Sequence, residues 1–248
     1  MDTRNTSCTA AAPTQPSSYA DLLRDLVRLL GGPEGGVDPA ARTPPLFRRL
    51  TEDAVLAHEG APLRSLYVVR SGSLKCVRTL GDGYEQVTAL ALPGDVLGFD
   101  GLHRGHHATT DVALEHATVY ALPLSTLHDL RRRYPALDRA WHEALSRQLA
   151  SASATADMLA AVTAEVRLAR FVLWLSARSR ELGWSPRRLR LSLCRRDLAS
   201  LLGMAHETLS RSFSTLAQAG LLTVDNRELE LLDVDEIQVR ARTTRRPE

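Results

Sequence analysis

Cysteine is scarce in this sequence. Its three cysteines, Cys8, Cys76 and Cys194, are odd in number and lie far apart, which argues against a disulfide framework. No apolar run approaches the ~20 residues that a membrane-spanning helix needs. The N-terminus lacks the apolar core of a signal peptide. We therefore expect a cytoplasmic protein with no membrane partner.

Lysine is almost absent, because Lys75 is the single lysine among the 31 basic residues. The formal net charge is only +2, so the chain as a whole is not a strongly basic nucleic-acid binder. Residues 163–220 nevertheless hold ten arginines against four acidic residues. Such a local excess of positive charge is typical of a surface that faces phosphates.

Catalytic signatures are missing as well. The segment HETLS at residues 206–210 begins like the zinc motif H-E-x-x-H but ends in Ser, so the second histidine ligand is absent. The segment SGS at residues 71–73 lacks the G-x-S-x-G spacing of an esterase nucleophile. The phosphate-binding pattern G-x-x-x-x-G-K-[ST] does not occur. We do not expect an enzyme.

Residues 1–45 form a predicted N-terminal extension. Residues 1–18 are rich in Thr, Ala, Pro and Ser and are predicted to be disordered. In residues 19–30 leucines recur at helical spacing, and Gly31 and Gly32 end the predicted helix. A Pro/Gly-rich linker follows to residue 45. We expect this helix to pack on the next domain, the alternative being a helix that binds a partner.

Residues 46–133 show the pattern of a β domain. Short runs rich in β-branched and other apolar residues alternate with turn residues, and Gly81-Asp82-Gly83 between two alternating runs predicts a hairpin. Many short strands at regular spacing indicate a β-sandwich or a roll.

Residues 134–162 predict one long helix. Its apolar residues follow spacings of three and four, close to a coiled-coil seam, namely Leu137, Trp141, Leu145, Leu149, Ala152, Ala156 and Leu159. The helix is too long for one small roll to cover, so we expect a second copy of it to cover the stripe in a homodimer. Burial within one subunit is the alternative.

Residues 163–236 predict a compact domain of short helices with a terminal hairpin. Thr163 is the expected N-cap of an amphipathic helix from residue 165 to 183. A β-hairpin with a turn at Asp225-Asn226-Arg227 follows a pair of short helices and has the position of a wing. Residues 237–248 are predicted to form a tail, which is charged and frayed from Arg240 onward. The overall class is α+β.

The helix pair is the segment around which this domain is organised. Leu198, Leu201 and Leu202 give the first helix an apolar stripe, and Gly203 is suited to the left-handed turn that ends it. A second helix is expected from His206 to Gln218. This is a helix-turn-helix pattern, whose second helix enters the DNA major groove. The expected DNA-binding residues are His206, Glu207, Thr208, Ser210 and Arg211.

Residues 207–211, ETLSR, resemble the E-x-x-S-R recognition helix of the Crp/Fnr superfamily of transcription regulators, on its Fnr-like side. The segments SLYVVRSG at 65–72 and LPGDVLGFD at 92–100 are similar to the sensor-domain signatures of that group. The resemblance spans about residues 50–233. It implies a cyclic-nucleotide-binding-like jelly roll, a dimerisation helix and a winged helix-turn-helix that reads a TTGAT-like inverted repeat. It also implies double-stranded DNA and RNA polymerase as partners.

The resemblance places an effector pocket at Gly98, Phe99, Arg104, Thr109 and Thr110. Cyclic-AMP-binding members use a Glu for the ribose and an Arg for the phosphate. Phe99 takes the place of that Glu, and Thr109-Thr110 lack that Arg, although Arg104 lies nearby. We do not expect cyclic AMP to bind.

Oxygen-sensing members of the superfamily hold a [4Fe–4S] cluster with four thiolates. The N-terminal region here has only Cys8, and Tyr120 corresponds to the fourth cysteine, so we do not expect the cluster either. A haem sensor, another small ligand or constitutive DNA binding remain open, and the effector is unknown. His103, His106 and His107 could bind a metal or haem, but we favour an exposed polar loop and expect no metal site.

Two hypotheses of function follow from these patterns. The first is a homodimeric, sequence-specific transcription regulator. The second is a ligand-binding or interaction module of the same fold that does not bind DNA. Glu207, Ser210 and Arg211 favour the first.

Overall fold

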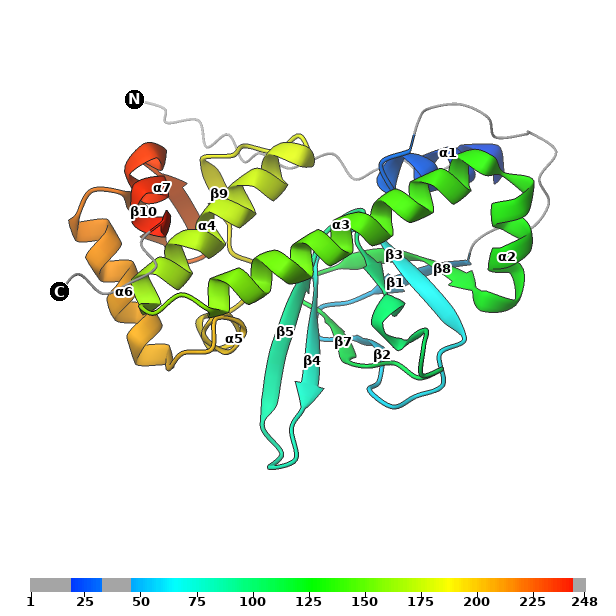
Figure 1. The fold of residues 1–248 in the computed structure, drawn as a ribbon, viewed down its shortest axis with the longest axis horizontal. Coiled ribbons are helices and arrows are strands. Elements are labelled where there is room, and N and C mark those ends of the chain that lie inside the picture. The colour runs from blue at the N-terminus through cyan, green and yellow to red at the C-terminus, as the bar shows by residue number, and fades with distance from the viewer. Residues whose placement is uncertain (1–18, 33–45, 243–248) are drawn as a thin grey trace, which may run out of the picture.

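The computed structural model describes residues 19–32 and 46–242. A β roll and a smaller helical domain lie at opposite ends of the molecule, and one long helix, α3 (Pro135–Leu159), runs across both (Figure 1). The expected α+β architecture is confirmed. Cys8, the predicted disorder of residues 1–18 and the last residues of the predicted tail lie outside the described residues.

The roll consists of two four-stranded antiparallel sheets with the strand orders β1-β8-β3-β6 and β2-β7-β4-β5. Side chains that alternate inward from both sheets form a buried core that includes Leu56, Val69, Leu74 and Val119. The strands are β1 (Leu46–Leu50), β2 (Val55–Ala57), β3 (Ser65–Ser71), β4 (Leu74–Thr79), β5 (Glu85–Ala91), β6 (Val96–Leu97), β7 (Thr110–Ala113) and β8 (Ala117–Pro123).

The predicted N-terminal helix is α1 (Tyr19–Leu29), and it packs on the roll and on α3 as expected. Leu23, Leu26 and Leu30 are fully buried there. Asp25 crosses to the roll, where it accepts hydrogen bonds from Arg70 Nε at 2.9 Å and from the Tyr120 hydroxyl. Burial raises the pKa of Asp25, but these hydrogen bonds outweigh it and hold the pKa below its usual value. The helix is therefore part of the sensor core.

Helix α2 (Leu124–Arg133) precedes α3 and was not expected, because residues 124–133 were assigned to the β domain. Only two of its apolar side chains, Leu127 and Leu130, are buried. Its apolar periodicity is therefore too short to indicate a helix, and it follows directly on the apolar residues of β8, from which it cannot be separated by pattern alone.

The expected dimer stripe on α3 is wrong at its N-terminal end. Leu137 and Trp141 are 0% and 4% exposed and belong to the sensor core, where the Trp141 ring meets the edge of Phe99 at a centroid distance of 4.9 Å. Leu145, Leu149 and Leu159 are 38%, 67% and 40% exposed. A helix of 25 residues presents different faces along its length, so α1 and the roll cover its first turns while the later stripe stays open.

The C-terminal domain contains α4 (Ala164–Glu181), β9 (Arg188–Arg190), α5 (Arg195–Leu201), α6 (His206–Gln218), β10 (Leu222–Asp225), β11 (Glu228–Leu231) and α7 (Val234–Arg242). Thr163 caps α4 as predicted, and its side chain accepts a hydrogen bond from the Val166 amide at 3.3 Å. The hairpin gains a third strand, β9, in the order β10-β11-β9. The expectation of a tail from residue 237, frayed from Arg240, is wrong as far as Arg242, because α7 continues to that residue and its Ile237 and Ala241 are buried against the domain core.

One hydrophobic core runs from the roll into the C-terminal domain. Val87, Leu90 and Leu92 of the roll belong to the same buried cluster as the interior of α4, α5 and α6. Arg178 of α4 also donates to the Pro93 carbonyl and to Asp95, each at 2.8 Å. The two domains are therefore packed together and not merely tethered by α3.

Candidate nucleic-acid interface

Helices α5 and α6 form the predicted helix-turn-helix. Gly203 has φ 59° at the turn, and the Met204 amide donates to the Ala199 carbonyl at 3.0 Å, which closes the end of α5. Leu198 and Leu202 on one side and Leu209 on the other are buried where the helices cross. The local apolar spacing predicted this pair because both helices bury one stripe against the same small core.

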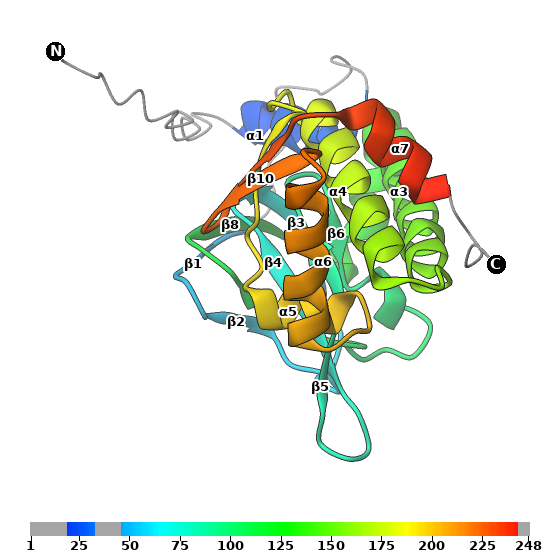
Figure 2. The same cartoon turned by 90° about the vertical axis from the view of Figure 1, so that its left-hand side faces the viewer.

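The outward face of α6 carries the residues predicted to meet DNA. His206, Glu207, Ser210 and Arg211 are exposed, and Thr208 is half-buried. Glu207, Ser210 and Arg211 stand at i, i+3 and i+4, so they share one side of the helix. Figure 2 shows α6 lying at the surface, in front of the other helices of the domain. A face of this kind can enter a major groove without rearrangement of its own helix.

Two arginines outside the predicted DNA-binding set support this geometry. Arg167 of α4 donates to the carbonyls of Leu202 and Gly203 at 3.2 and 2.9 Å, and to the Ala161 carbonyl at 2.9 Å. It therefore ties the end of α3 to the turn of the helix-turn-helix. Nothing in its local sequence signals this role, since its partners lie up to 36 residues away.

The second supporting arginine is Arg195, at the start of α5. Its guanidinium lies over the ring of Phe213 at 3.8 Å from the centroid, and burial lowers its pKa. It links the first turn of α5 to the middle of α6. The two helices are thus held by a cation–π contact as well as by apolar packing.

The wing turns at Asn226, whose φ of 53° is the left-handed conformation that Asn tolerates best among larger residues. Next to it, β9 places Arg188 and Arg190 on the surface. Arg188 pairs with Glu230 at 3.3 Å, and Arg190 approaches Glu115 of the roll at 3.7 Å. These two pairs balance a small part of the positive charge counted in residues 163–220.

The residues expected to form the effector pocket lie near one another in sequence, but all except the exposed Arg104 serve the packing of the roll. Phe99 is buried against Trp141. Thr109 donates to Asp111 at 3.0 Å, and Thr110 accepts from the Glu59 amide at 3.0 Å. Arg104 is exposed, and its Nε donates to His103 at 3.0 Å.

Gly98, the remaining residue of the expected pocket, has φ 96°, and a Cβ there would lie 3.0 Å from the side chains of Leu63 and Leu66. The surroundings of Gly98 are therefore tightly packed.

A buried carboxyl group lies inside the roll beside this region. Asp111 of β7 is 1% exposed and faces Cys76 of β4 across the sheet. Burial raises the pKa of Asp111 to about 6 and raises that of the Cys76 thiol well above its usual value. An anionic phosphate brought here would meet an acidic group, which is the opposite of what phosphate binding needs.

The side chains of His103, His106 and His107 do not point toward a common site. His103 and His106 are exposed, and His107 is buried with its ring stacked near Tyr67 at a centroid distance of 6.1 Å. Burial lowers the pKa of His107. Among residues 19–32 and 46–242, no group of three or more His, Cys, Asp or Glu side chains is arranged to hold a metal ion. In the same ranges no helix is long and apolar enough to cross a membrane.

Comparison with known families matches both halves of the chain. Residues 47–134 match the family described as "Cyclic nucleotide-binding domain", and residues 166–239 match "Crp-like helix-turn-helix domain". These ranges correspond to the roll with α2 and to the domain from α4 to α7.

Individual relatives extend over most of the chain. The "Fumarate and nitrate reduction regulatory protein" of Salmonella typhimurium is 35% identical over 186 residues, which cover 75% of this chain and 74% of the relative. The "Transcriptional activator protein anr" of Pseudomonas aeruginosa is 33% identical over 190 residues, 77% of this chain and 78% of the relative. Among solved structures, FixK2 from Bradyrhizobium japonicum superposes with a TM-score of 0.70 at 25% identity and covers 81% of this chain and 99% of its own.

Proposed function

Since this chain belongs to the Crp/Fnr family of DNA-binding transcription regulators, we propose that it is a homodimer that reads a TTGAT-like inverted repeat through α6. The observation that carries the proposal is the shared, exposed face of Glu207, Ser210 and Arg211 on a helix whose opposite face is buried. The family is one of regulators, so the protein is not an enzyme.

Each side chain on this face has a base edge that it suits. The guanidinium of Arg211 can donate twice, to O6 and N7 of a guanine. The carboxylate of Glu207 can accept from the N4 amino group of a cytosine, and the hydroxyl of Ser210 suits either kind of edge. A G·C pair at the centre of each half-site is therefore the expected anchor. His206, at the first position of the helix, sets the outermost contact.

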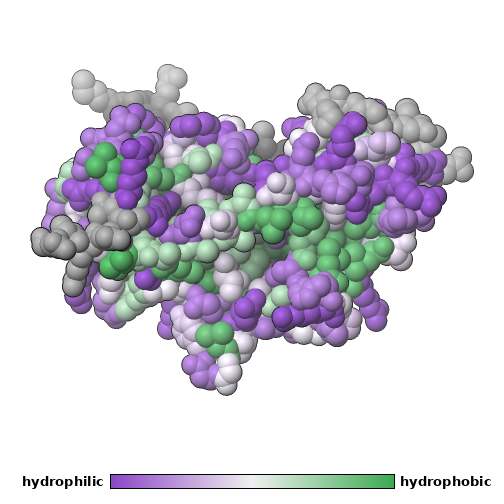
Figure 3. Space-filling model, viewed as in Figure 1, coloured by the Kyte–Doolittle hydropathy of each residue, from purple (hydrophilic) through white to green (hydrophobic). Residues whose placement is uncertain are grey.

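A two-fold symmetric dimer presents two copies of α6, so its DNA site should contain two inverted half-sites about one helical turn apart. Regulators of this family act as dimers. We propose that the partner subunit covers the open stripe of α3, formed by Leu145, Leu149, Ala152, Ala156 and Leu159, all of which are exposed in the single chain. Figure 3 shows hydrophobic residues along the line that α3 follows in Figure 1.

Two effectors used elsewhere in the family fit this chain poorly. Cyclic AMP needs a cationic site for its phosphate, whereas the roll offers the carboxyl of Asp111 and an exposed Arg104. A [4Fe–4S] cluster needs four thiolates, and the chain has three cysteines, of which Cys76 lies inside the roll and Cys194 caps α5. We propose that neither group is the effector.

The remaining partners follow from the family. We propose that the dimer acts in the cytoplasm, on promoter DNA, and that it contacts RNA polymerase there. The second hypothesis, a module of the same fold without DNA binding, is kept as an outcome of the experiment that follows.

The test is a selection from a random DNA library with the wild type, Arg211→Ala and Arg132→Ala side by side. Arg132 is exposed on α2, in the sensor half of the chain, and serves as the matched control. We expect the wild type and the control to select the same palindrome, and Arg211→Ala to lose about 1–3 kcal/mol per half-site together with preference at the guanine. Equal guanine selection by all three would refute the placement of Arg211. Failure of the wild type to select any sequence would favour the module without DNA binding.

A further inference from the structure

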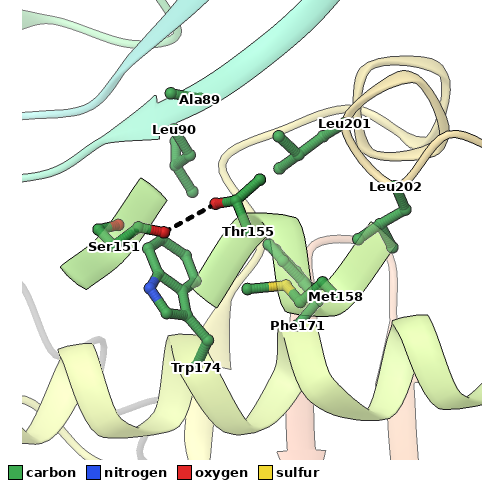
Figure 4. A pocket seen from close by; sticks show the side chains of 9 residues that line it. All are labelled: Ala89, Leu90, Ser151, Thr155, Met158, Phe171, Trp174, Leu201 and Leu202. Carbon is green, nitrogen blue, oxygen red and sulfur yellow. Dashed lines mark hydrogen bonds between the residues drawn. The ribbon is translucent and has the colours of Figure 1, made fainter. Parts of the chain in front are cut away.

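A pocket opens where the roll meets the C-terminal domain (Figure 4). Its enclosed volume is about 30 Å³, and the space between its walls out to the open solvent at its mouth is about 370 Å³, so an occupant larger than water must part the walls. Four elements contribute its lining: Ala89 and Leu90 from β5; Ser151, Thr155 and Met158 from α3; Phe171 and Trp174 from α4; and Leu201 and Leu202 from α5. We name it the junction pocket. None of its lining residues belongs to the effector position expected from the sequence.

The lining of the junction pocket indicates the chemistry of an occupant. It contains leucine, methionine and aromatic side chains and no charged residue. The polar side chains are the two hydroxyls of Ser151 and Thr155 and the indole of Trp174. The Thr155 hydroxyl already donates to the Ser151 carbonyl at 3.0 Å, so it is left to accept. A small, uncharged, mainly apolar molecule with at most one donor group fits this lining.

The effector position expected inside the roll is filled by side chains of the chain itself. There the ring of Phe99 packs on Trp141, and the carboxyl group of Asp111 is buried. The junction pocket is instead bounded by elements of both domains, so its shape would change if the C-terminal domain swung away from the roll. A ligand there would be well placed to affect the orientation of α6.

Polar contacts beside the pocket fasten α5 to the roll, and we name them the Ser200 clamp. The Ser200 hydroxyl accepts from the Val87 amide at 3.0 Å and from the Tyr84 hydroxyl at 3.2 Å, while Gln86 donates to the Ser200 carbonyl. Lys75, the only lysine of the chain, pairs with Asp197 of α5 at 2.7 Å.

The residues of the Ser200 clamp are close neighbours in the chain of residues that line the junction pocket. Leu201 follows Ser200 directly, and Ala89 lies two residues after Val87. Spreading of β5 from α5 by an occupant would therefore lengthen the hydrogen bonds of the Ser200 clamp. Directional bonds of this kind weaken steeply when they are stretched or bent.

We propose that the junction pocket binds a small, uncharged, mainly apolar molecule, and that its occupancy loosens the Ser200 clamp and lowers the affinity for operator DNA. The regulatory half of this proposal rests on the proposed function, and the binding half does not. The clamped state, in which the recognition face of α6 is exposed, is the one assigned to DNA binding.

The binding half is tested with protein labelled at its methionine methyl groups with ¹³C, and with benzene and phenol as probes. The chain has three methionines, and Met158 lines the pocket while Met204 does not. We expect the Met158 methyl signal to shift with saturation as either probe is added. The Met204 signal, assigned with a Met204→Leu variant, should move less.

Ala89→Trp provides the matched variant, because Ala89 is an exposed residue at the rim of the pocket and a large ring there would cover it. Ala177→Trp, at an exposed position of α4 that does not line the pocket, is the control. We expect Ala89→Trp to abolish the Met158 shift and Ala177→Trp to retain it. A linear, unsaturated shift, or an equal shift in both variants, would overturn the binding site.

The regulatory half is measured with the operator found by library selection. Saturating phenol should weaken DNA binding at least threefold in the wild type and in Ala177→Trp, and should leave Ala89→Trp unchanged. A Met158 shift with unchanged or tighter DNA binding would overturn the coupling while keeping the site. Loss of all specific DNA binding would count against the proposed function alone, because the methyl titration does not depend on DNA.

Discussion

Leu149 provides the sharpest test of how two copies of this chain meet. Its side chain is 67% exposed in the middle of the open stripe of α3, although leucine is a residue that proteins usually bury. We expect Leu149→Glu to separate the dimer, since it would place two like charges where the helices meet. The folding of each subunit should hardly change, because the side chain contacts little within its own chain.

The magnitude follows from the exposed area. Full burial of a leucine is worth about 1.5–3 kcal/mol, so burying the two-thirds that is open contributes about 1–2 kcal/mol per subunit. Two-fold symmetry doubles this to about 2–4 kcal/mol, which corresponds to about 30-fold to 1,000-fold in the dimer dissociation constant. The buried charges add to this loss.

The assay is sedimentation over a dilution series, with thermal unfolding measured in parallel. Ala150→Glu is the matched control, because Ala150 is exposed on the same helix but lies off the stripe. Leu137→Ala is the complementary variant. Leu137 is fully buried in the sensor core, so its truncation should cost about 2–5 kcal/mol of unfolding free energy and should not specifically weaken the dimer. An unchanged dissociation constant for Leu149→Glu would refute the assignment of the stripe.

Three further predictions concern the roll and its contact with the C-terminal domain. Folded Asp111, with a pKa of about 6 against an ordinary 3.8, keeps its proton where the unfolded chain has lost it. Its own contribution to stability should therefore fall by about 3 kcal/mol as the pH rises from about 4 to about 6. The difference in stability between the wild type and Asp111→Asn, measured by chemical denaturation, should change over this pH range, and a difference independent of pH would contradict the assignment. Ser200→Ala leaves the buried Val87 amide without its acceptor, at about 1–3 kcal/mol, so hydrogen exchange at Val87 should accelerate; unchanged exchange would mean that the clamp does not form. In a double-mutant cycle, Lys75→Ala and Asp197→Ala should show a coupling energy of about 0.5–1 kcal/mol that shrinks with salt; strict additivity would exclude the ion pair.

Elements whose signals are local could be predicted from the sequence. The apolar spacing around Leu198 and Leu209, with Gly203 between them, indicated two helices and the turn that joins them, and Thr163 indicated where α4 begins. These signals depend on residues three or four positions apart, which the helix itself brings together. The exposed face of α6 that we propose to read DNA followed from the same periodicity, because burial of one side of the helix leaves the other side exposed.

Only the tertiary structure decided which surface each stripe meets. Along α3 the sequence shows one continuous series of apolar residues, yet Trp141 is covered by Phe99 and Leu149 is open. The burial of Asp111 and the docking of Ser200 on β5 likewise depend on segments far apart in the chain, in the latter case more than 110 residues. Local periodicity indicates that one face of a helix is buried. It does not indicate which element covers that face, because many apolar surfaces of similar shape could pack against the same stripe. That choice is made by how all the elements pack together.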